Sequence, residues 1–191
     1  YKLGNRTLNQ VFSKHVESPV MDLAWNAGSL CYIALGSGLI AVFNAQDQSI
    51  KPFAKHEGVI SIACIQFGST ELLLTLGVNK QLLVWSTNNG AGNLAFTIVL
   101  DKVPTSMDVD LVSNIVLIGV GAHFAVYFLQ KLQSNDTSVQ YVQIVLDAPI
   151  SCVRIRDRAE AELSTFNSRL RKVIASGTDG RVYVGELNLD S

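Results

Sequence analysis

Short apolar segments recur along the chain at a nearly constant spacing. Segments in which apolar and polar residues alternate begin at Val20, Val59, Thr105 and Ile150, and these starts are 39, 46 and 45 residues apart. Alternation of this kind, bounded by Gly, Asn, Asp or Ser, indicates β-strands. Self-similarity at a period of about 20–50 residues is typical of repeat architectures. We therefore expect the chain to fold as successive copies of one small β unit.

The copy between residues 55 and 100 is the most complete. It contains four predicted strands, Val59–Ile65, Glu71–Leu76, Gln81–Trp85 and Asn93–Leu100. Turn residues separate these strands at Gly68-Ser69, at Gly77–Lys80 and in the Asn- and Gly-rich stretch 88–92. Strands joined by short turns pair as antiparallel hairpins. The unit is therefore predicted to be a four-stranded antiparallel sheet.

The same order of strands is predicted in the other units. Second strands are expected at Leu30–Leu35, Asn114–Ile118 and Lys172–Ser176, third strands at Leu39–Phe43, Phe124–Phe128 and Arg181–Leu187, and outer strands at Ser49–Phe53 and Val139–Leu146. The units cover residues 20–53, 59–100, 105–146 and 150–188 of one all-β domain, of which residues 1–191 form a part. Residues 1–13, with a strand at Thr7–Phe12, are expected to be the end of a preceding unit.

Polar residues of the second unit resemble those of a WD-repeat β-propeller blade. Such a blade begins with a Gly-His-like turn and carries an Asp in its second turn, ahead of a Trp-Asp pair. Here the histidine is His56, Asn79 replaces the turn Asp six residues before Trp85, and Ser86 replaces the last Asp. The resemblance implies a β-propeller, with about four blades of a larger, seven-bladed ring. It also implies that His56, Thr75, Asn79 and Trp85 form a hydrogen-bonded chain that holds the blade together.

A narrower resemblance concerns the order of motifs over residues 55–187. A lead-in segment with His56-Glu57 is followed by a plainer one at Asp101-Lys102 and then by the segment Gly180-Arg181-Val182-Tyr183-Val184. This order is similar to that of the nuclear-pore mRNA-export WD-repeat family and its mitotic-checkpoint Bub-type paralogues. The family implies a non-enzymatic adaptor, in the nucleus, at the nuclear pore or in the cytoplasm, that binds a short peptide motif of a nucleoporin or checkpoint protein.

Six partner-binding residues are carried over from that family by their place in the motifs. They are His56, Glu57, Asn79, Lys80, Asp179 and Arg181. Lys80 and Arg181 are expected at equivalent positions just after the second turn, and therefore on the same face. Two alternatives stay open: an adaptor of a coat or other nucleoporin complex, and a propeller enzyme with its active site in the central channel.

The sequence carries little sign of catalysis or cofactor binding. It contains no G-x-S-x-G, H-E-x-x-H, Cys-x-x-Cys, Walker or G-x-G-x-x-G motif. The net charge of −1 disfavours general binding to nucleic-acid backbones, and no apolar run approaches the length of about 18 residues that indicates a membrane span. Its three cysteines are expected to be small core side chains. We therefore expect no enzyme activity, cofactor, metal, nucleic acid or membrane partner.

Charged residues on the first strands are the one hint of a channel site. Asp22, Asp108 and Asp110 are predicted to face the central channel, together with Arg154 and Arg156. Rings of channel carboxylates are expected to be a hydrated lining. A propeller enzyme needs several converging arginines or metal ligands at that place, and the sequence offers few.

Two polar segments interrupt the strand pattern. Lys131–Ser138 is expected to be a mobile loop, and Asp157–Arg171 is an insertion expected to be either a short amphipathic helix or a disordered excursion. The insertion is expected to be solvated, with a role in partner binding as the alternative. The chain begins with Tyr1 and has no signal-like segment, which suggests a piece of a longer protein.

Overall fold

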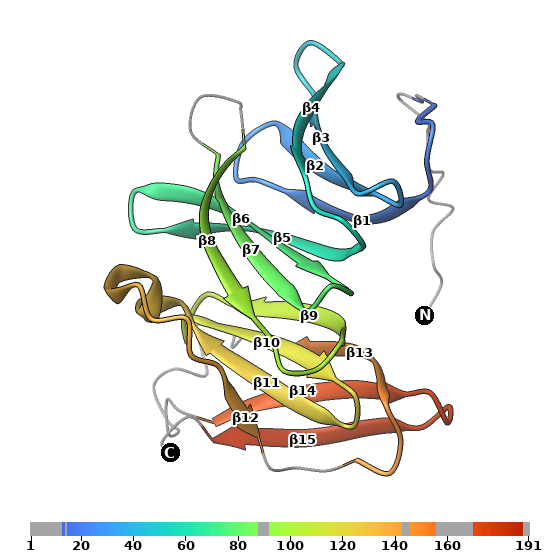
Figure 1. Ribbon diagram of the computed structural model, residues 1–191, viewed down its shortest axis with the longest axis vertical. Coiled ribbons are helices and arrows are strands. Elements are labelled where there is room, and N and C mark those ends of the chain that lie inside the picture. Colours follow the sequence, from blue (N-terminus) through green and yellow to red (C-terminus); the bar gives the residue numbers. More distant parts are fainter. Residues whose placement is uncertain (1–12, 14, 88–91, 143–145, 156–169, 189–191) are drawn as a thin grey trace, which may run out of the picture.

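The computed structural model describes residues 13, 15–87, 92–142, 146–155 and 170–188 (Figure 1). In this part of the chain, 15 strands form four antiparallel sheets, and the only helical segment is the 3-10 helix η2, Leu129–Ser134. The all-β class expected from the sequence is therefore confirmed. Among the described residues, no helix is both long enough and apolar enough to cross a membrane.

Each sheet is built from strands that follow one another in the chain. The first sheet contains β1 (Val20–Trp25), β2 (Leu30–Leu35), β3 (Leu39–Asn44) and β4 (Ser49–Lys55). The second contains β5 (Val59–Phe67), β6 (Thr70–Gly77), β7 (Gln81–Ser86) and β8 (Asn93–Val99). The third contains β9 (Pro104–Asp110), β10 (Ile115–Val120), β11 (His123–Phe128) and β12 (Gln140–Val142). The fourth contains β13 (Ile150–Ile155), β14 (Leu170–Gly177) and β15 (Val182–Asn188).

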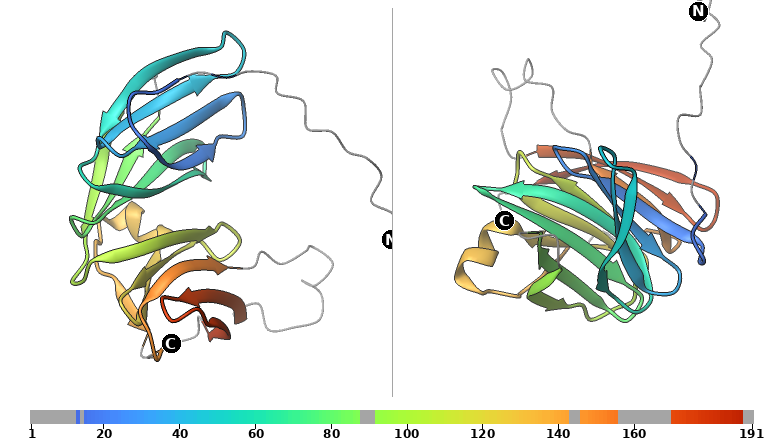
Figure 2. Two further views of the ribbon diagram at one scale, coloured as in Figure 1. Left: turned by 90° about the vertical axis from the view of Figure 1, so that its right-hand side faces the viewer. Right: turned by 90° about the horizontal axis from the view of Figure 1, so that it is seen from above.

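The four sheets follow one another along a curve (Figure 2, left). The first strands of consecutive sheets are in contact: β1 with β5, β5 with β9, and β9 with β13. The strand order within each sheet is the order in the sequence, so no strand crosses from one sheet to another. The arrangement is a series of meanders placed face to face.

Most of the apolar core lies in three layers, and each layer fills the junction between two consecutive sheets. Tyr32, Ala34, Ile40, Leu73, Leu83 and Trp85 fill the first junction; Leu74, Leu82, Val84, Val116, Ile118 and Ala125 the second; and Leu117, Phe124, Val126, Val153, Val173 and Ala175 the third. Because successive side chains of a strand point to opposite faces, a sheet with neighbours on both sides needs apolar residues at every position. Every residue of β10, Ile115–Val120, is accordingly buried.

A register shift recurs at the beginning of the first strand in every sheet. It lies between Val20 and Asp22, between Val59 and Ser61, between Pro104 and Ser106, and between Ile150 and Cys152. Because the shift is at the same place, the pairing of the first, second and third strands aligns the four sheets residue by residue. The four-unit repeat predicted from the sequence is therefore present in the backbone of the described residues.

Carboxylates on the first strands connect consecutive sheets. Asp22 Oδ2 accepts hydrogen bonds from Ser61 Oγ at 2.8 Å and from the Ile62 N–H at 2.9 Å. Asp108 Oδ2 accepts one from the Ile155 N–H at 2.8 Å. All three bonds join a first strand to the first strand of the next sheet. These two residues therefore hold consecutive sheets together, a role that the predicted hydrated lining did not include.

A buried ion pair connects the third sheet to the fourth. Asp110 is 0% exposed and Arg171 is 3% exposed, and Arg171 Nε donates to Asp110 Oδ2. Burial by itself raises the pKa of Asp110, but its interactions with Ser113 and Arg171 outweigh burial and hold that pKa below its ordinary value. Asp110 therefore stays charged inside the junction, and the prediction of a hydrated lining is wrong for this residue.

The predicted strands agree with the structure to within about two residues at most ends. Val20–Trp25 and Leu30–Leu35 have the predicted bounds, whereas the last outer strand covers only Gln140–Val142 of the described residues. The predicted strand at Thr7–Phe12 and residues 157–169 of the insertion lie outside the described residues. Arg171, which the sequence assigns to the solvated insertion, belongs to β14 and is buried.

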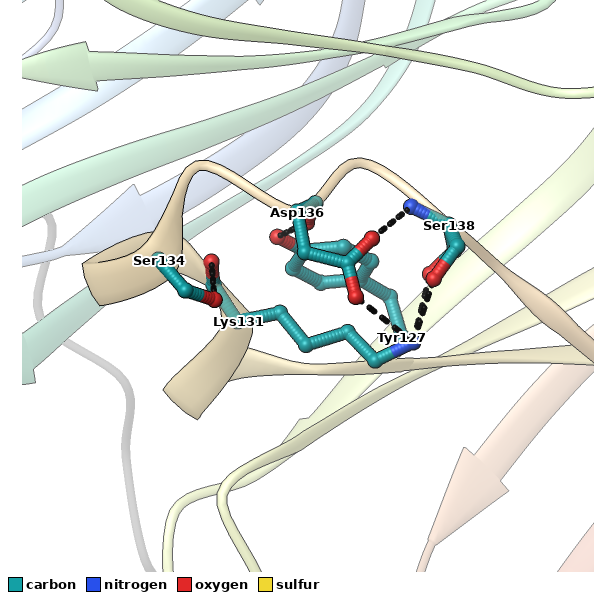
Figure 3. A network of polar contacts seen from close by, with 5 residues as sticks. All are labelled: Tyr127, Lys131, Ser134, Asp136 and Ser138. Atoms are coloured by element: carbon teal, nitrogen blue, oxygen red, sulfur yellow. Dashed lines mark hydrogen bonds and ion pairs between the residues drawn. The ribbon is translucent and has the colours of Figure 1, made fainter.

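The polar segment Lys131–Ser138 is more regular than its composition predicts (Figure 3). Its first part belongs to η2, and Leu132 is buried in the second junction. Tyr127 donates its hydroxyl hydrogen to the Asp136 carbonyl at 2.8 Å, and Lys131 Nζ donates to Ser138 Oγ at 2.6 Å. The segment is therefore partly helical and fastened to the third sheet, where the sequence predicts a loop.

The buried ion pair gives the first testable prediction. Asp110→Ala removes one partner of a buried pair, so we expect the free energy of unfolding to fall by about 3–5 kcal/mol. Urea denaturation followed by circular dichroism measures the change. Asp147→Ala, which removes one partner of the exposed Arg181–Asp147 pair, is the matched control, and we expect a much smaller effect. Equal losses in the two variants would contradict the assignment.

The same pair predicts a pH dependence. The pKa of Asp110 in the folded protein is lowered, whereas that of an aspartate in the unfolded chain is about 3.9. The contribution of Asp110 to stability is therefore complete above about pH 4 and is lost as the pH falls through the folded pKa. Stability measured between about pH 5 and pH 2 should fall less steeply in Asp110→Ala than in the wild type.

Candidate functional site

The predicted partner-binding residues lie at one end of the sheets. This end is formed by the second turns, which join second to third strands, and by the lead-in segments before the first strands; we call it the turn end. A backbone hydrogen bond joins turn to lead-in segment in the second sheet, from Val78 N–H to Gly58 O at 2.9 Å, and in the fourth, from Thr178 N–H to Pro149 O at 2.9 Å. The turn end is therefore a braced surface built from short segments.

A chain of side-chain hydrogen bonds supports the turn end in the second sheet. Trp85 Nε1 and Thr75 Oγ1 are 2.8 Å apart, Thr75 Oγ1 and His56 Nδ1 are 2.8 Å apart, and His56 Nε2 and Asn79 Oδ1 are 3.2 Å apart. His56 is 2% exposed, and Thr75 and Trp85 are also buried. The hydrogen-bonded chain expected from the WD resemblance is therefore present with all four of its predicted members.

The direction of these bonds follows from the chemistry of the groups. The indole N–H of Trp85 can only donate, so Thr75 Oγ1 accepts it and passes its own hydrogen to His56 Nδ1. His56 is then neutral, with its hydrogen on Nε2, and donates to Asn79. Burial is the main cause that lowers the pKa of His56, although the bond to Asn79 partly opposes it. A neutral imidazole linked at both nitrogens is suited to structural support.

Gly77 makes room for this arrangement. A Cβ atom at that position would lie 2.5 Å from both His56 Nε2 and Asn79 Oδ1. No side chain can occupy that space without separating the histidine from the turn. The glycine is therefore part of the same support.

The fourth sheet uses an ion-pair network at the same place. By strand pairing, Asp179 corresponds to Asn79, and Asp147, three residues before its first strand, corresponds to His56. Arg181 NH1 lies 3.1 Å from Asp147 Oδ2, and Tyr183 donates its hydroxyl hydrogen to Asp179 Oδ2 at 3.1 Å. The Arg181 backbone N–H is the main cause that lowers the pKa of the Asp179 carboxyl. This network is exposed, unlike the buried chain in the second sheet.

Lys80 and Arg181 do not occupy equivalent positions, which corrects the prediction from sequence. Gly77 pairs with Gln81 in the second sheet, and Ser176 pairs with Val182 in the fourth. When these pairs are used to align the two sheets, Arg181 corresponds to Gln81, and Lys80 corresponds to Gly180. Lys80 and Gly180 share a left-handed backbone, with φ of 65° and 80°. Lys80 Nζ donates to the Asp101 carbonyl in the next lead-in segment at 3.2 Å.

The six predicted site residues therefore separate into two groups. His56 is buried, and its side chain supports the turn from within. Glu57, Asn79, Lys80, Asp179 and Arg181 are exposed at the turn end. Asp101 and Asp147, which contact Lys80 and Arg181, were not predicted, although each lies three residues before its first strand, as His56 does.

A shallow hollow of about 340 Å³ lies on the side of the first strands. Its lining includes Asp22, Asp108 and Arg154. The carboxylates of Asp22 and Asp108 accept backbone N–H groups, so they are held as structural acceptors. Among the described residues, no three His, Cys, Asp or Glu side chains gather as they would around a metal ion.

Comparisons with known proteins add information about the fold alone. No family model matches the chain, and no curated protein matches it. Among solved structures, the chain is similar to the computationally designed Ika4 protein, with a TM-score of 0.65 and 14% identity over 95% of this chain and 100% of that one. It is also similar to the computationally designed Ika8 protein, with a TM-score of 0.60 and 14% identity over 88% of this chain and 46% of that one.

The buried histidine gives a prediction about stability. His56→Ala leaves Thr75 and Asn79 without their partner, so we expect the free energy of unfolding to fall by about 1–3 kcal/mol. Thermal and urea denaturation measure the loss, and His15→Ala, at an exposed position, is the control. An unchanged melting temperature in His56→Ala would contradict the supporting role.

The lowered pKa of His56 gives a prediction about pH. As the pH falls below about 6.5, the unfolded chain takes up a proton before the folded protein does. Stability is therefore full above that pH and falls as the solution is acidified towards the folded pKa. Asn79→Asp places a carboxylate beside Nε2, which should favour the charged imidazole and reduce this loss. Equal pH profiles for the wild type and His56→Ala would contradict the prediction.

Proposed function

We propose that the four sheets are consecutive blades of a WD-type β-propeller, at residues 20–53, 59–100, 105–146 and 150–188, and that this propeller is a non-enzymatic scaffold for a protein partner. The sequential order of strands, the repeated register shift and the chain from His56 to Trp85 support the propeller assignment. Propellers expose short loops on a stiff support, and such loops commonly carry binding residues.

The observation that carries the scaffold proposal is that buried and exposed polar side chains at the turn end have separate roles. The buried polar groups of the second sheet bond to one another, so they serve the fold. The exposed side chains Glu57, Lys80, Asp179 and Arg181 stand on braced turns of two sheets. Rigid backbone that presents exposed charges is suited to recognising a short peptide, because little ordering entropy is lost on binding.

The partner we propose is a short peptide of a nucleoporin or checkpoint protein, as the family resemblance implies. Binding would take place in the nucleus, at the nuclear pore or in the cytoplasm. Arg181 already lies within ion-pair distance of Asp147 and Asp179, whereas Lys80 contacts a carbonyl oxygen. A carboxylate of the partner would therefore gain more from Lys80 than from Arg181.

An adaptor of a coat complex or of another nucleoporin complex uses the same surface, and the partner peptide distinguishes these cases. An enzyme with its site on the first strands is the weaker candidate. Its acids would be Asp22 and Asp108, and both already accept backbone N–H groups.

Charge reversal tests the proposal. We expect Lys80→Glu to weaken the binding of acidic synthetic peptides from nucleoporins and checkpoint proteins by about tenfold, and Arg181→Glu to weaken it less. Isothermal titration calorimetry at low and at physiological salt measures the affinities. Lys51→Glu, an exposed charge reversal on the outer strand β4, is the matched control. A peptide that binds the wild type and Lys80→Glu equally would place the recognition surface elsewhere.

A further inference from the structure

Three positions lie on the same side of every described sheet, and in the first three sheets this side faces the next sheet. Strand pairing aligns the first set as Tyr32, Leu74, Leu117 and Ile174, the second as Ile40, Leu82, Phe124 and Val182, and the third as Val42, Val84, Val126 and Val184. We call this side of a sheet its forward face. All of these residues are apolar, and in the first three sheets they are buried or half-buried in a junction.

In the fourth sheet the same three positions are open to solvent. Ile174 is 46% exposed, Val182 68% and Val184 72%. Their equivalents in the second sheet, Leu74, Leu82 and Val84, are at most 1% exposed. The forward face of the fourth sheet thus has the composition of a junction without a following sheet.

The opposite end of the curve has the matching feature. Leu23, Ile62, Met107 and Val153 occupy one position of the four first strands, on the side that faces the preceding sheet. Ile62, Met107 and Val153 are at most 5% exposed, whereas Leu23 is 54% exposed. Trp25, also on β1, is 56% exposed. We call this side the rear face of the first sheet. Its central residues Cys31, Ile33 and Ala41 are at most 9% exposed, in a cluster against which Val16 and Phe43 pack, so Leu23 and Trp25 are its open part.

Each junction inside the chain joins a forward face to a rear face. The chain therefore carries both halves of one more junction, at opposite ends of its curve. We propose that two copies of this chain associate head to tail, with the forward face of each fourth sheet packed on the rear face of the partner's first sheet. A second copy covers the exposed apolar residues of both faces at once and continues the series of junctions already present.

Similar folds occur among solved structures both as a whole chain and as part of a longer one. The fold of this chain matches the whole of Ika4 and 46% of Ika8, so a chain about twice as long accommodates the arrangement within half of its length. Two copies would bring eight sheets together, within the range of about 4–8 blades seen in propellers. That number is one more than the seven expected from the sequence. The proposal does not depend on the peptide-binding role.

Sedimentation velocity over a concentration series up to about 100 μM tests the association. We expect the 191-residue chain to be a dimer at the upper end. Val184→Asp on the forward face and Leu23→Asp on the rear face should each raise the dissociation constant by about 100-fold or more, because each places a charge in an apolar junction. Val99→Asp, at a 66% exposed position of the outer strand β8, is the matched control and should remain dimeric. Circular dichroism checks that every variant is folded.

A mixing experiment tests the head-to-tail geometry. The two variants, Val184→Asp and Leu23→Asp, should be monomeric alone but associate when combined, because the combined pair has one junction with both faces intact. A monomeric wild type overturns the proposal. A Leu23→Asp variant that stays dimeric also overturns it, because contact would then be between like faces, as does a mixture that stays monomeric. Loss of the dimer in Val99→Asp would place the contact on the outer strands and overturn it too.

Discussion

The structure depends on burying both faces of every internal sheet. A single sheet of three or four short strands exposes apolar side chains on both sides, so its stability comes from its neighbours. β10 shows the result in the sequence, because all its residues from Ile115 to Val120 are apolar or glycine and all are buried. This constraint explains why the four sheets form although the sequence contains no Trp-Asp pair. The junctions need apolar volume, and leucine, valine and isoleucine supply it as well as tryptophan does.

The second and fourth sheets satisfy the hydrogen-bonding groups of the turn end in different ways. The second sheet buries the chain from Trp85 through Thr75 to His56. In the third sheet, Tyr127 occupies the position of Trp85, but its hydroxyl bonds the Asp136 carbonyl, which lies beyond the end of the third strand and away from the turn end. The fourth sheet has Gly185 at that position and supports its turn with the exposed ion pairs of Arg181. The second and fourth sheets thus support the same turn with two different side-chain chemistries.

The sequence predicted the features that depend on the local spacing of apolar and turn residues. It predicted less well the features that depend on contacts between residues far apart in the chain. Alternation and turn residues located nearly every strand, and the spacing of His56, Asn79 and Trp85 predicted their hydrogen-bonded chain. The equivalence of Lys80 and Arg181 was wrong because Gly180 takes the left-handed turn position that Lys80 takes in the second sheet. Arg171 was assigned to the solvated insertion because its partner, Asp110, lies 61 residues earlier in the chain, and no local pattern connects them.

The hydrogen bonds of the first-strand carboxylates have the same direction along the series of sheets. Asp22 and Asp108 each accept an N–H from the first strand of the following sheet, so each bond runs forward along the chain. In the fourth sheet the corresponding positions hold Cys152 and Arg154, and neither side chain can accept such a bond as a carboxylate does. A sheet that follows the fourth therefore cannot be joined to it by a carboxylate bridge of this kind, and the junction depends on apolar contact instead. The apolar residues Ile174, Val182 and Val184 on the forward face are the part of the chain that can supply it.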